Sequence, residues 1–494
     1  MSDPTVGTSV LGGENGMNSS EAETRTVSFI GLMNYTLLNR YVFHASLNAE
    51  GNSAMGRNKR MGYFPAAGIA WNLQNESFME SLRDRWLDEA KIRVSVGQSG
   101  RAPSGTSIYL GAYVKGDNYM NMSGTKPERM QLDDLHWETS TEYNYGADVM
   151  LFGGRLKFTF DYYQKYIKDL LQKDYKLPSS TGFGSMRYYN SGKMENKGWE
   201  FRADAIFWKN KDWQISGYVN LSRNENRITE LPGNMAQETY EANNGKYAAR
   251  VEVGQPVGAF YGYRYLGVYK DKDATYARDA SGNIMNDVHG KPIVMKNLTK
   301  ACQPGDAIYE DINHDGVINQ YDIVYLGNYN PVLTGGAGLT VKYKQVSLSA
   351  FFHGRFGQSI VNTARMNNES MYSDDNQSTA VLRRWRNEGD VTDIPRALYK
   401  EGYNYLGSDR FVEDASFIRL KTLTLNYLFP KKICNRLGIN TLSCFVTGYN
   451  LFTWTNYTGQ DPEVEIPTKP TDLAEDKATT PVSMRFAFGI NLNF

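Results

Sequence analysis

The sequence predicts an all-β protein, an antiparallel transmembrane β-barrel, from three observations. Apolar and polar residues alternate with a period of two in many segments, the pattern of strands with one apolar and one wet face. Tight turns and long loops alternate between these segments, and 13% of the residues are aromatic. No run of about 18 apolar residues occurs, so no transmembrane helix is predicted.

The last strand shows the alternation most clearly. Large apolar residues stand at every second position up to the carboxy terminus, namely Met484, Phe486, Phe488, Ile490, Leu492 and Phe494. About ten residues of this pattern make one tilted strand across a bacterial outer membrane. An edge strand of a soluble sandwich is the alternative for this segment taken alone.

Three hairpins repeat the pattern along the chain. They cover residues 143–162, with a turn at 152–155, residues 199–221 and residues 339–352. In the second hairpin, one face carries Glu200, Arg202 and Asp204. A charged face of this kind indicates a wet lumen rather than a dry core.

The connections are predicted to separate by length between the two ends of the barrel. Short ones are expected at 38–40, 153–154, 209–212 and 344–345, and long polar ones at 98–134, 172–194, 230–332, 358–413 and 455–481. Outer-membrane barrels place their long loops outside the cell. A soluble sandwich has no reason to separate loop lengths in this way.

The number of strands follows from this division. Counting back from a periplasmic carboxy terminus gives about thirteen crossings, the first near Thr26–Leu37, and leaves residues 1–25 as the end of an extracellular loop. The count requires residues 258–269 to lie in a surface loop rather than to cross. Single-chain bacterial barrels have even strand numbers, so the odd count predicts a truncated barrel over residues 26–494.

Composition excludes several classes of function. Lys+Arg and Asp+Glu balance at 54 each, which does not favour nucleic acid as a partner. Cys302, Cys434 and Cys444 have no disulfide or metal spacing, and the amino terminus lacks the regions of a signal peptide. No catalytic motif occurs, and His353 alternates as a lumen-facing strand residue. We therefore expect no enzyme activity and no required cofactor.

A calcium-type loop is predicted at residues 311–322, inside the large insertion at about 230–332. The pattern of a twelve-residue calcium loop assigns the ligands to Asp311, Asn313, Asp315, the Val317 carbonyl and Asp322, with Gly316 at the sharp turn. Oxygen ligands favour a hard cation, so structural Ca²⁺ is the expectation. The alternative is a surface turn whose Asp and Asn side chains bond their own backbone.

Loop tyrosines are the candidate contacts for a ligand or a partner. The candidates are Tyr188, Tyr189, Tyr261, Tyr263, Tyr403 and Tyr405. Their rings could stack on sugars or face a lid protein, and the alternative is that they pack their own loops.

The chain resembles the carboxy-terminal half of SusC/RagA-type TonB-linked outer-membrane proteins, the nutrient importers of Bacteroidota. The resemblance rests on segments in family order: Asn34-Tyr35, Asn39–Tyr41, Gly62–Pro65, Ala70-Trp71, Asn75–Phe78, Lys91–Gly97, Asn196–Glu200, Gly305-Asp306 leading into Asp311–Gly316, Arg384-Trp385, Asp393–Arg396, Ser416–Leu425, Asn450–Thr453 and Asp461–Glu463. Each segment is weak alone, and their joint order is specific.

This resemblance implies a fold and a function. Such proteins have barrels of roughly 22 strands with an amino-terminal plug and a TonB box, neither of which is recognised in this sequence. It implies import of oligosaccharides or peptides, with a SusD-like surface lipoprotein as partner. Energy would come from TonB–ExbB–ExbD through the amino-terminal part that this sequence lacks.

The resemblance also gives the carboxy terminus a role in assembly. Phe486, Phe488, Ile490, Leu492 and Phe494 resemble the signal that the barrel-assembly machinery reads. We therefore expect the chain in the lipid of the outer membrane. The alternative function is that of a soluble or surface-attached β-rich protein that binds glycans with its aromatic loops.

Overall fold

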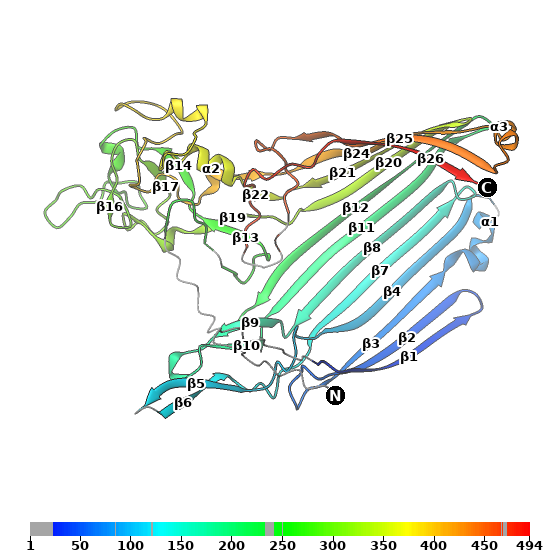
Figure 1. Ribbon diagram of the computed structural model, residues 1–494, viewed down its shortest axis with the longest axis horizontal. Helices are drawn as coiled ribbons and strands as arrows, with labels where there is room; N and C mark the ends of the chain where they lie inside the picture. The colour runs from blue at the N-terminus through cyan, green and yellow to red at the C-terminus, as the bar shows by residue number, and fades with distance from the viewer. Residues whose placement is uncertain are drawn as a thin grey trace, which may run out of the picture.

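The computed structural model describes residues 23–83, 85–119, 122–232, 242–248, 250–465, 467 and 472–494. Its main feature is an antiparallel sheet of 13 strands that follow one another in chain order (Figure 1). The strands are β1 (Thr26–Leu37), β2 (Tyr41–Asn52), β3 (Met61–Asn72), β4 (Leu87–Arg101), β7 (Glu138–Leu151), β8 (Leu156–Lys168), β11 (Lys193–Lys209), β12 (Trp213–Glu230), β20 (Leu333–Tyr343), β21 (Val346–Phe356), β24 (Phe417–Leu428), β25 (Thr441–Thr455) and β26 (Arg485–Asn493). The predicted all-β fold and the count of thirteen crossings from Thr26 are confirmed.

The predicted hairpins form with the expected turns. Leu151 pairs with Leu156, and the turn between them contains Phe152, Gly153 and Gly154 at φ of 59°, 66° and 76°. Glycine is needed here because left-handed backbone carries little penalty without a Cβ. The other two hairpins turn at residues 210–212 and 344–345.

The long connections carry smaller elements outside the large sheet. Their strands are β5 (Ala112–Tyr119), β6 (Met122–Arg129), β9 (Leu171–Lys176), β10 (Ser185–Asn190), β13 (Ala259–Gly262), β14 (Tyr265–Val268), β15 (Lys296–Asn297), β16 (Lys300–Ala301), β17 (Ala307–Tyr309), β18 (Val317–Ile318), β19 (Val324–Asn328), β22 (Ser359–Val361) and β23 (Val412–Asp414). Strands β13 and β14 pair with β19 and β17. Residues 258–269 therefore lie outside the large sheet, as the strand count required.

Helices are short and lie between strands. The α-helices are α1 (Glu80–Arg83), α2 (Thr363–Glu369) and α3 (Lys431–Arg436), and the 3₁₀ turns are η1 (Leu73–Asn75), η2 (Ser77–Met79), η3 (Ser179–Thr181), η4 (Asp273–Thr275), η5 (Gln320–Asp322), η6 (Thr379–Arg383) and η7 (Asp409–Phe411). No helix in the described ranges is long and apolar enough to cross a membrane.

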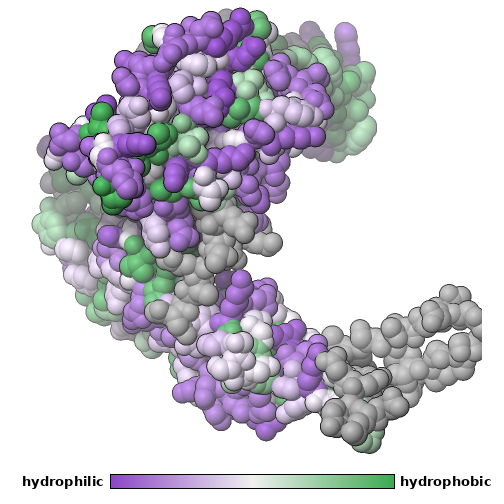
Figure 2. Space-filling view, turned by 90° about the vertical axis from the view of Figure 1, so that its left-hand side faces the viewer, coloured by the Kyte–Doolittle hydropathy of each residue, from purple (hydrophilic) through white to green (hydrophobic). Residues whose placement is uncertain are grey.

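The two ends of the sheet differ in their connections. In Figure 1 the long loops gather at the left end and the tight turns at the right end, where the carboxy terminus also lies. Two right-end connections, 73–86 and 429–440, are longer than the short turns expected there and contain α1 and α3. Helix α3 follows Pro430, whose fixed φ suits a helix start. Seen from the loop end, the molecule is a crescent with a largely hydrophilic surface (Figure 2).

Candidate functional site on the lumen wall

The two faces of the sheet have opposite chemistry along each row of paired strands. On one face a row crosses seven strands through Tyr41, Trp71, Ile92, Ala147, Phe160, Phe201 and Leu221. On the other face a row runs through Arg93, Gly146, Asp161, Glu200, Ser222, Thr334 and Arg355. We call the first the outer face and the second the lumen face. This polarity suits a wall between lipid and water.

The outer face exposes its apolar side chains. The exposed fractions of Phe29, Val94, Tyr145 and Leu425 are 66%, 46%, 47% and 50%. Aromatic pairs occur toward both ends: the ring centroids of Trp213 and Tyr343 are 4.4 Å apart at the tight-turn end, and those of Phe452 and Trp454 are 6.1 Å apart toward the loop end. Apolar residues in such numbers are stable on a surface only when a nonaqueous medium covers them.

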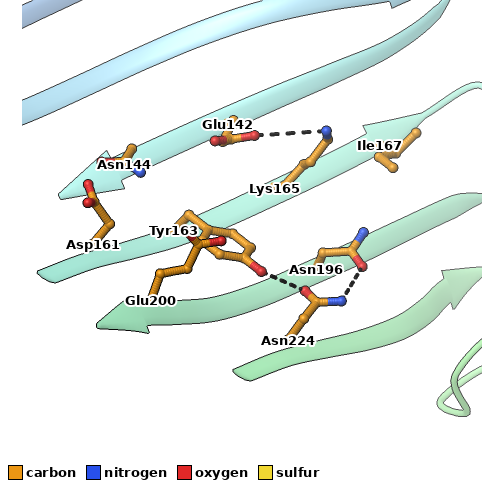
Figure 3. Close-up of a pocket in the computed structure, with 9 residues that line it drawn as sticks. All are labelled: Glu142, Asn144, Asp161, Tyr163, Lys165, Ile167, Asn196, Glu200 and Asn224. Carbon is orange, nitrogen blue, oxygen red and sulfur yellow. Dashed lines mark hydrogen bonds and ion pairs between the residues drawn. The ribbon is translucent and has the colours of Figure 1, made fainter. Parts of the chain in front are cut away.

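A polar cavity of about 520 Å³ opens on the lumen face of β7, β8, β11 and β12 (Figure 3). It is lined by Glu142, Asn144, Asp161, Tyr163, Lys165, Ile167, Asn196, Glu200 and Asn224. Glu142 lies four positions from the loop end of β7, so the cavity is in the loop-side half of the wall. We take this cavity as the candidate site because it opens on the face that would line an aqueous path.

The lining side chains are arranged in three cross-strand rows. The first row contains Glu142, Lys165 and Asn196, the second Asn144, Tyr163, Gly198 and Asn224, and the third Gly146, Asp161, Glu200 and Ser222. The Tyr163 hydroxyl donates to Asn224 Oδ1 at 3.0 Å, and Asn224 Nδ2 donates to Asn196 Oδ1 at 3.5 Å. These bonds hold the ring and the amides against the wall.

Two glycines let large side chains lie flat on this wall. A Cβ at Gly198 would stand 2.5 Å from the Tyr163 hydroxyl oxygen and 2.3 Å from the Arg223 carbonyl oxygen. A Cβ at Gly146 would stand 2.6 Å from Arg93 Cζ. Because no real Cβ contact is that short, glycine at both positions keeps the space that Tyr163 and Arg93 occupy.

Ion pairs neutralise part of the cavity. Arg93 bonds Asp148 at 2.8 Å and Asp161 at 3.1 Å, so it crosses β7 above Gly146. Lys165 lies 3.8 Å from Glu142. Glu200 makes no ion pair with another described residue, although Figure 3 places it beside Tyr163. The cavity therefore keeps one carboxylate without a cation.

A second stretch of the lumen face is covered by the loop 456–484. Arg419 on β24 bonds Asp461 at 2.5 Å and Glu463 at 2.7 Å, and only 3% of its side chain is exposed. Lys421 also bonds Glu463, at 2.7 Å. Burial raises the pKa of Asp461, but bonds from the Glu463 N–H and from Arg419 outweigh it, so the pKa lies below its ordinary value of 3.8.

The loops 231–332, 357–416 and 456–484 pack on one another at the left end of Figure 1. One buried cluster joins all three through Phe260, Ile360, Phe411 and Tyr457. A buried ion-pair network supports it, in which Glu369 accepts from Arg365 at 2.9 Å and from Arg410 at 2.8 Å. The loop assembly therefore has its own core.

The six predicted contact tyrosines divide into two groups. Tyr261 and Tyr263 are 0% exposed and Tyr188 is 5% exposed, so in this structure these three pack their loops and leave no ring surface for a ligand. The Tyr188 hydroxyl bonds the Ser104 backbone and side chain. For these three rings the contact hypothesis gives way to the packing alternative.

The other three tyrosines retain exposed surface, and their contact role stays a prediction. Tyr189 stacks on Tyr175 with centroids 4.8 Å apart, and Tyr405 meets the edge of Tyr372 at 5.6 Å. Tyr403 packs beside the cluster that contains Tyr261. Each of these rings lies at the border of a packed loop.

The predicted calcium loop has the expected sharp turn. Gly316 adopts φ of 79°, and its N–H donates to Asp311 Oδ2 at 2.8 Å. Asn313 Oδ1 accepts from the Asp315 N–H, and Asp315 Oδ1 accepts from the Val317 N–H. These are also the bonds of a surface turn, so this geometry fits both hypotheses.

Asp322 differs from the other predicted ligands because it is buried. Its carboxylate accepts from the Ile312 and Asn319 N–H groups at 2.9 and 2.8 Å. Burial raises its pKa, against the effect of these two bonds. Among the described residues no group of three His, Cys, Asp or Glu side chains is placed to hold a metal, so Asp311, Asp315 and Asp322 are not gathered around one point in this structure.

The carboxy-terminal residues of the predicted assembly signal all lie on the outer face of the edge strand β26 or just after it. Phe486, Phe488, Ile490, Leu492 and Phe494 are 53–82% exposed. Strand β26 pairs with β25, from Thr441 opposite Asn493 to Tyr449 opposite Arg485. Their role in assembly stays a prediction.

Sequence reasoning named Glu200 as lumen-facing but missed the cavity around it. The remaining lining residues come from four strands, and residues 169–192 separate β8 from β11. Alternation shows which face each residue occupies. It does not give the register that brings Asp161 opposite Glu200.

Comparison with known proteins now identifies the family. The sequence model of the TonB dependent receptor-like β-barrel matches residues 2–289, more than half of the chain. The chain belongs to this family. The receptors of this family are outer-membrane proteins rather than enzymes, which agrees with the apolar outer face and disfavours the soluble alternative.

Relatives and solved structures support the same assignment. TonB-dependent receptor P3 of Formosa agariphila is 30% identical over 490 residues, covering 96% of this chain and 46% of the relative. TonB-dependent receptor SusC of Bacteroides thetaiotaomicron is 29% identical, covering 95% and 44%. The RagAB peptide transporter has a similar fold, with a TM-score of 0.76 at 24% identity, covering 97% of this chain and 50% of that one. This TonB-dependent receptor chain thus spans about half the length of the curated relatives it matches.

Proposed function

We propose that the chain forms part of the wall of an outer-membrane importer for nutrients, either oligosaccharides or peptides. The observation that carries this proposal is the 13-stranded sheet with an apolar outer face and a charged lumen face. A wall of this kind separates lipid from an aqueous path, and membership of the receptor family supports its use in transport. The protein would act by binding and passage, without bond chemistry.

The proposed partners follow from the same family. A SusD-like surface lipoprotein would cap the loop end, where the packed loops 231–332, 357–416 and 456–484 offer a preformed surface. TonB–ExbB–ExbD would supply the energy, and the barrel-assembly machinery would insert the strands. The outer-membrane lipid would cover the apolar face.

A growth experiment tests the import function and its substrate class. A strain in which the gene is deleted is grown on a panel of single oligosaccharides and single peptides, and the gene is restored on a plasmid. We expect slow growth on members of one class only and recovery with the plasmid. Unchanged growth on both classes, together with the protein in the soluble fraction, would overturn the proposal.

We also propose that Ca²⁺ clamps the loop 311–322. Asp311, Asn313, Asp315, Asp322 and the Val317 carbonyl supply the oxygen ligands a hard cation prefers, and the turn at Gly316 has the required backbone. When bound, the ion would balance the carboxylates of the loop. Its part is structural, and no step of import passes through it.

Terbium luminescence distinguishes the clamp from a simple turn. The chain is titrated with Tb³⁺, and a matched pair of variants, Asp315→Asn and Asp287→Asn, is compared. Asp287 is the control because its carboxylate also accepts backbone N–H groups, from His289 and Lys291. The clamp predicts loss of luminescence in Asp315→Asn alone. Equal signals from both variants would contradict it.

A further inference from the structure

We propose that the lumen-wall cavity binds a cationic group of the passing substrate, an ammonium or a guanidinium, between Glu200 and the ring of Tyr163. This inference rests on the proposed import function and adds a substrate chemistry to it. It depends on the charge balance of the cavity, on its fixed aromatic ring and on its position along the wall.

The charge balance leaves one carboxylate available. The lining contains three carboxylates and one lysine. Arg93 holds Asp161 at 3.1 Å, and Lys165 lies near Glu142. Glu200 has no cation among the described residues, and it is exposed to the lumen. A cation arriving from the lumen therefore finds Glu200 free to bind it.

The strand register makes the unpaired carboxylate unfavourable when nothing is bound. Glu200 stands directly opposite Asp161 on β8 and opposite Ser222 on β12. Like charges at directly opposed positions destabilise a sheet. Arg93 is shared between Asp148 and Asp161, so negative charge remains opposite Glu200. A bound cation would relieve this repulsion, whereas an anionic ligand would meet Glu200, which no described cation pairs. The site is consequently selective for positive charge.

The ring and the amides complete the site. Tyr163 is held over Gly198 by its bond to Asn224, and it is partly exposed beside Glu200 (Figure 3). Cations are attracted to aromatic ring faces. The side-chain oxygens of Asn144 and Asn196 add acceptors for the N–H groups of an ammonium or guanidinium. The cavity therefore offers many acceptors to a ligand rich in donors.

The position of the cavity suits a substrate on its way through the lumen. Lys165 lies three positions from the loop end of β8, and Glu142 four positions from that of β7. A substrate that has passed the loops would thus meet the cavity before the tight-turn half of the wall. The same cationic chemistry occurs in basic peptides and in amino sugars, so the test includes both.

Binding of four small probes to the full chain in zwitterionic micelles tests the inference. The probes are trilysine, a glucosamine trimer, triglutamate and maltotriose, and saturation-transfer NMR gives their apparent Kd. We expect trilysine or the glucosamine trimer to bind most tightly, and Glu200→Gln to weaken that binding about fivefold. Raising the salt concentration should weaken it further.

Asp204→Asn is the matched control. Asp204 is on the same strand and face, but its carboxylate is paired with Arg202 at 2.7 Å and lies outside the lining. This variant should leave the affinity of the cationic probe unchanged. Equal affinity of the wild type and Glu200→Gln for both cationic probes, or equally tight binding of triglutamate, would overturn the inference.

The two proposals fail in different experiments. If the protein in micelles shows no preference for cationic probes, the cation site is contradicted, but the growth phenotype and the outer-membrane location still support the import function. If the deletion strain grows unchanged, the proposed import function is contradicted, even if trilysine binds to the protein in micelles. If Glu200→Gln does not fold, the salt dependence of trilysine binding to the wild type decides: affinity that does not fall with salt overturns the inference.

Discussion

Two stretches of the lumen face lie on one row of cross-strand pairs but have different neighbours. Cross-strand pairing joins Arg202 on β11 to Arg419 on β24 through Asn220, Gly336 and His353. The Arg202 side chain is 52% exposed and pairs with Asp204 of its own strand. The Arg419 side chain is 3% exposed and pairs with acids of the loop 456–484. We call these stretches the open wall and the covered wall.

A loop, rather than the strands, therefore determines which part of the wall a substrate can reach. Both stretches carry a guanidinium group on the lumen face of the sheet. The covered wall is occupied by Asp461 and Glu463, whose carboxylates act as a built-in anionic ligand. The open wall has no such segment in the described residues and keeps the cavity at Glu200 accessible.

Removing the cation of the covered wall should have the largest effect. Arg419→Met leaves two mostly buried carboxylates with reduced compensation, and breaking a buried ion pair costs about 3–5 kcal/mol of unfolding free energy. Urea unfolding of the full chain in micelles, followed by tryptophan fluorescence, measures this loss.

The control is Arg202→Met on the open wall. Because the Arg202 pair is exposed, its loss should cost less than about 1 kcal/mol. Equal costs for the two variants would show that the loop does not shield the covered wall.

A glycine of the open wall should have the next largest effect. Gly198→Ala brings a Cβ to 2.3 Å from the Arg223 carbonyl and 2.5 Å from the Tyr163 hydroxyl. Overpacking of this kind costs about 1–3 kcal/mol, and it should also displace the ring of Tyr163. Gly31→Ala is the matched control because a Cβ there meets nothing within 4 Å. A stability of Gly198→Ala equal to that of Gly31→Ala would contradict the flat packing of the ring.

The covered wall should open in acid. The pKa of Asp461 is lower in the folded chain than its ordinary 3.8, so its contribution to stability is present above that pH and is lost as pH falls through the folded pKa. We expect pepsin to cut the loop 456–484 faster as the pH is lowered below about 3.8. In Arg419→Met this acceleration should be weaker. The activity of pepsin on an unfolded substrate is measured at the same pH values. If the rate at which the loop is cut changes with pH only as much as that activity does, the predicted opening is excluded.

The comparison also marks the limit of sequence reasoning. Period-two alternation, together with the separation of loop lengths and the parity count, placed the thirteen crossings. Alternation alone assigned Glu200 and His353 to the lumen face, because a buried or lipid-covered face fixes side-chain parity. The pairing of Arg419 with Asp461 joins residues 42 positions apart through a folded loop. Local patterns carry no information about such contacts.

The loop tyrosines show a second limit. Tyr261 and Tyr263 belong to a short alternating segment, and the sequence left open whether such rings face a ligand or a core. The structure buries both between strands of the same loop assembly. A ring in a long polar loop is equally suited to either role, and only the contacts of the folded loop decide between them.

The smallest expected effect is on stability at the open wall, and it separates repulsion from structural support. Because Arg93 is shared between Asp148 and Asp161, negative charge remains opposite Glu200. Glu200→Gln should therefore raise the unfolding free energy by about 0.5 kcal/mol, since a cross-strand repulsion of like charges is removed. Asp204→Asn should instead lower it slightly, because that carboxylate has a cation at 2.7 Å. Paired urea titrations at low salt measure both signs. If Glu200→Gln instead lowers the unfolding free energy, the Glu200 carboxylate stabilises the wall. Its position opposite Asp161 would then be explained by stability alone, without a bound cation.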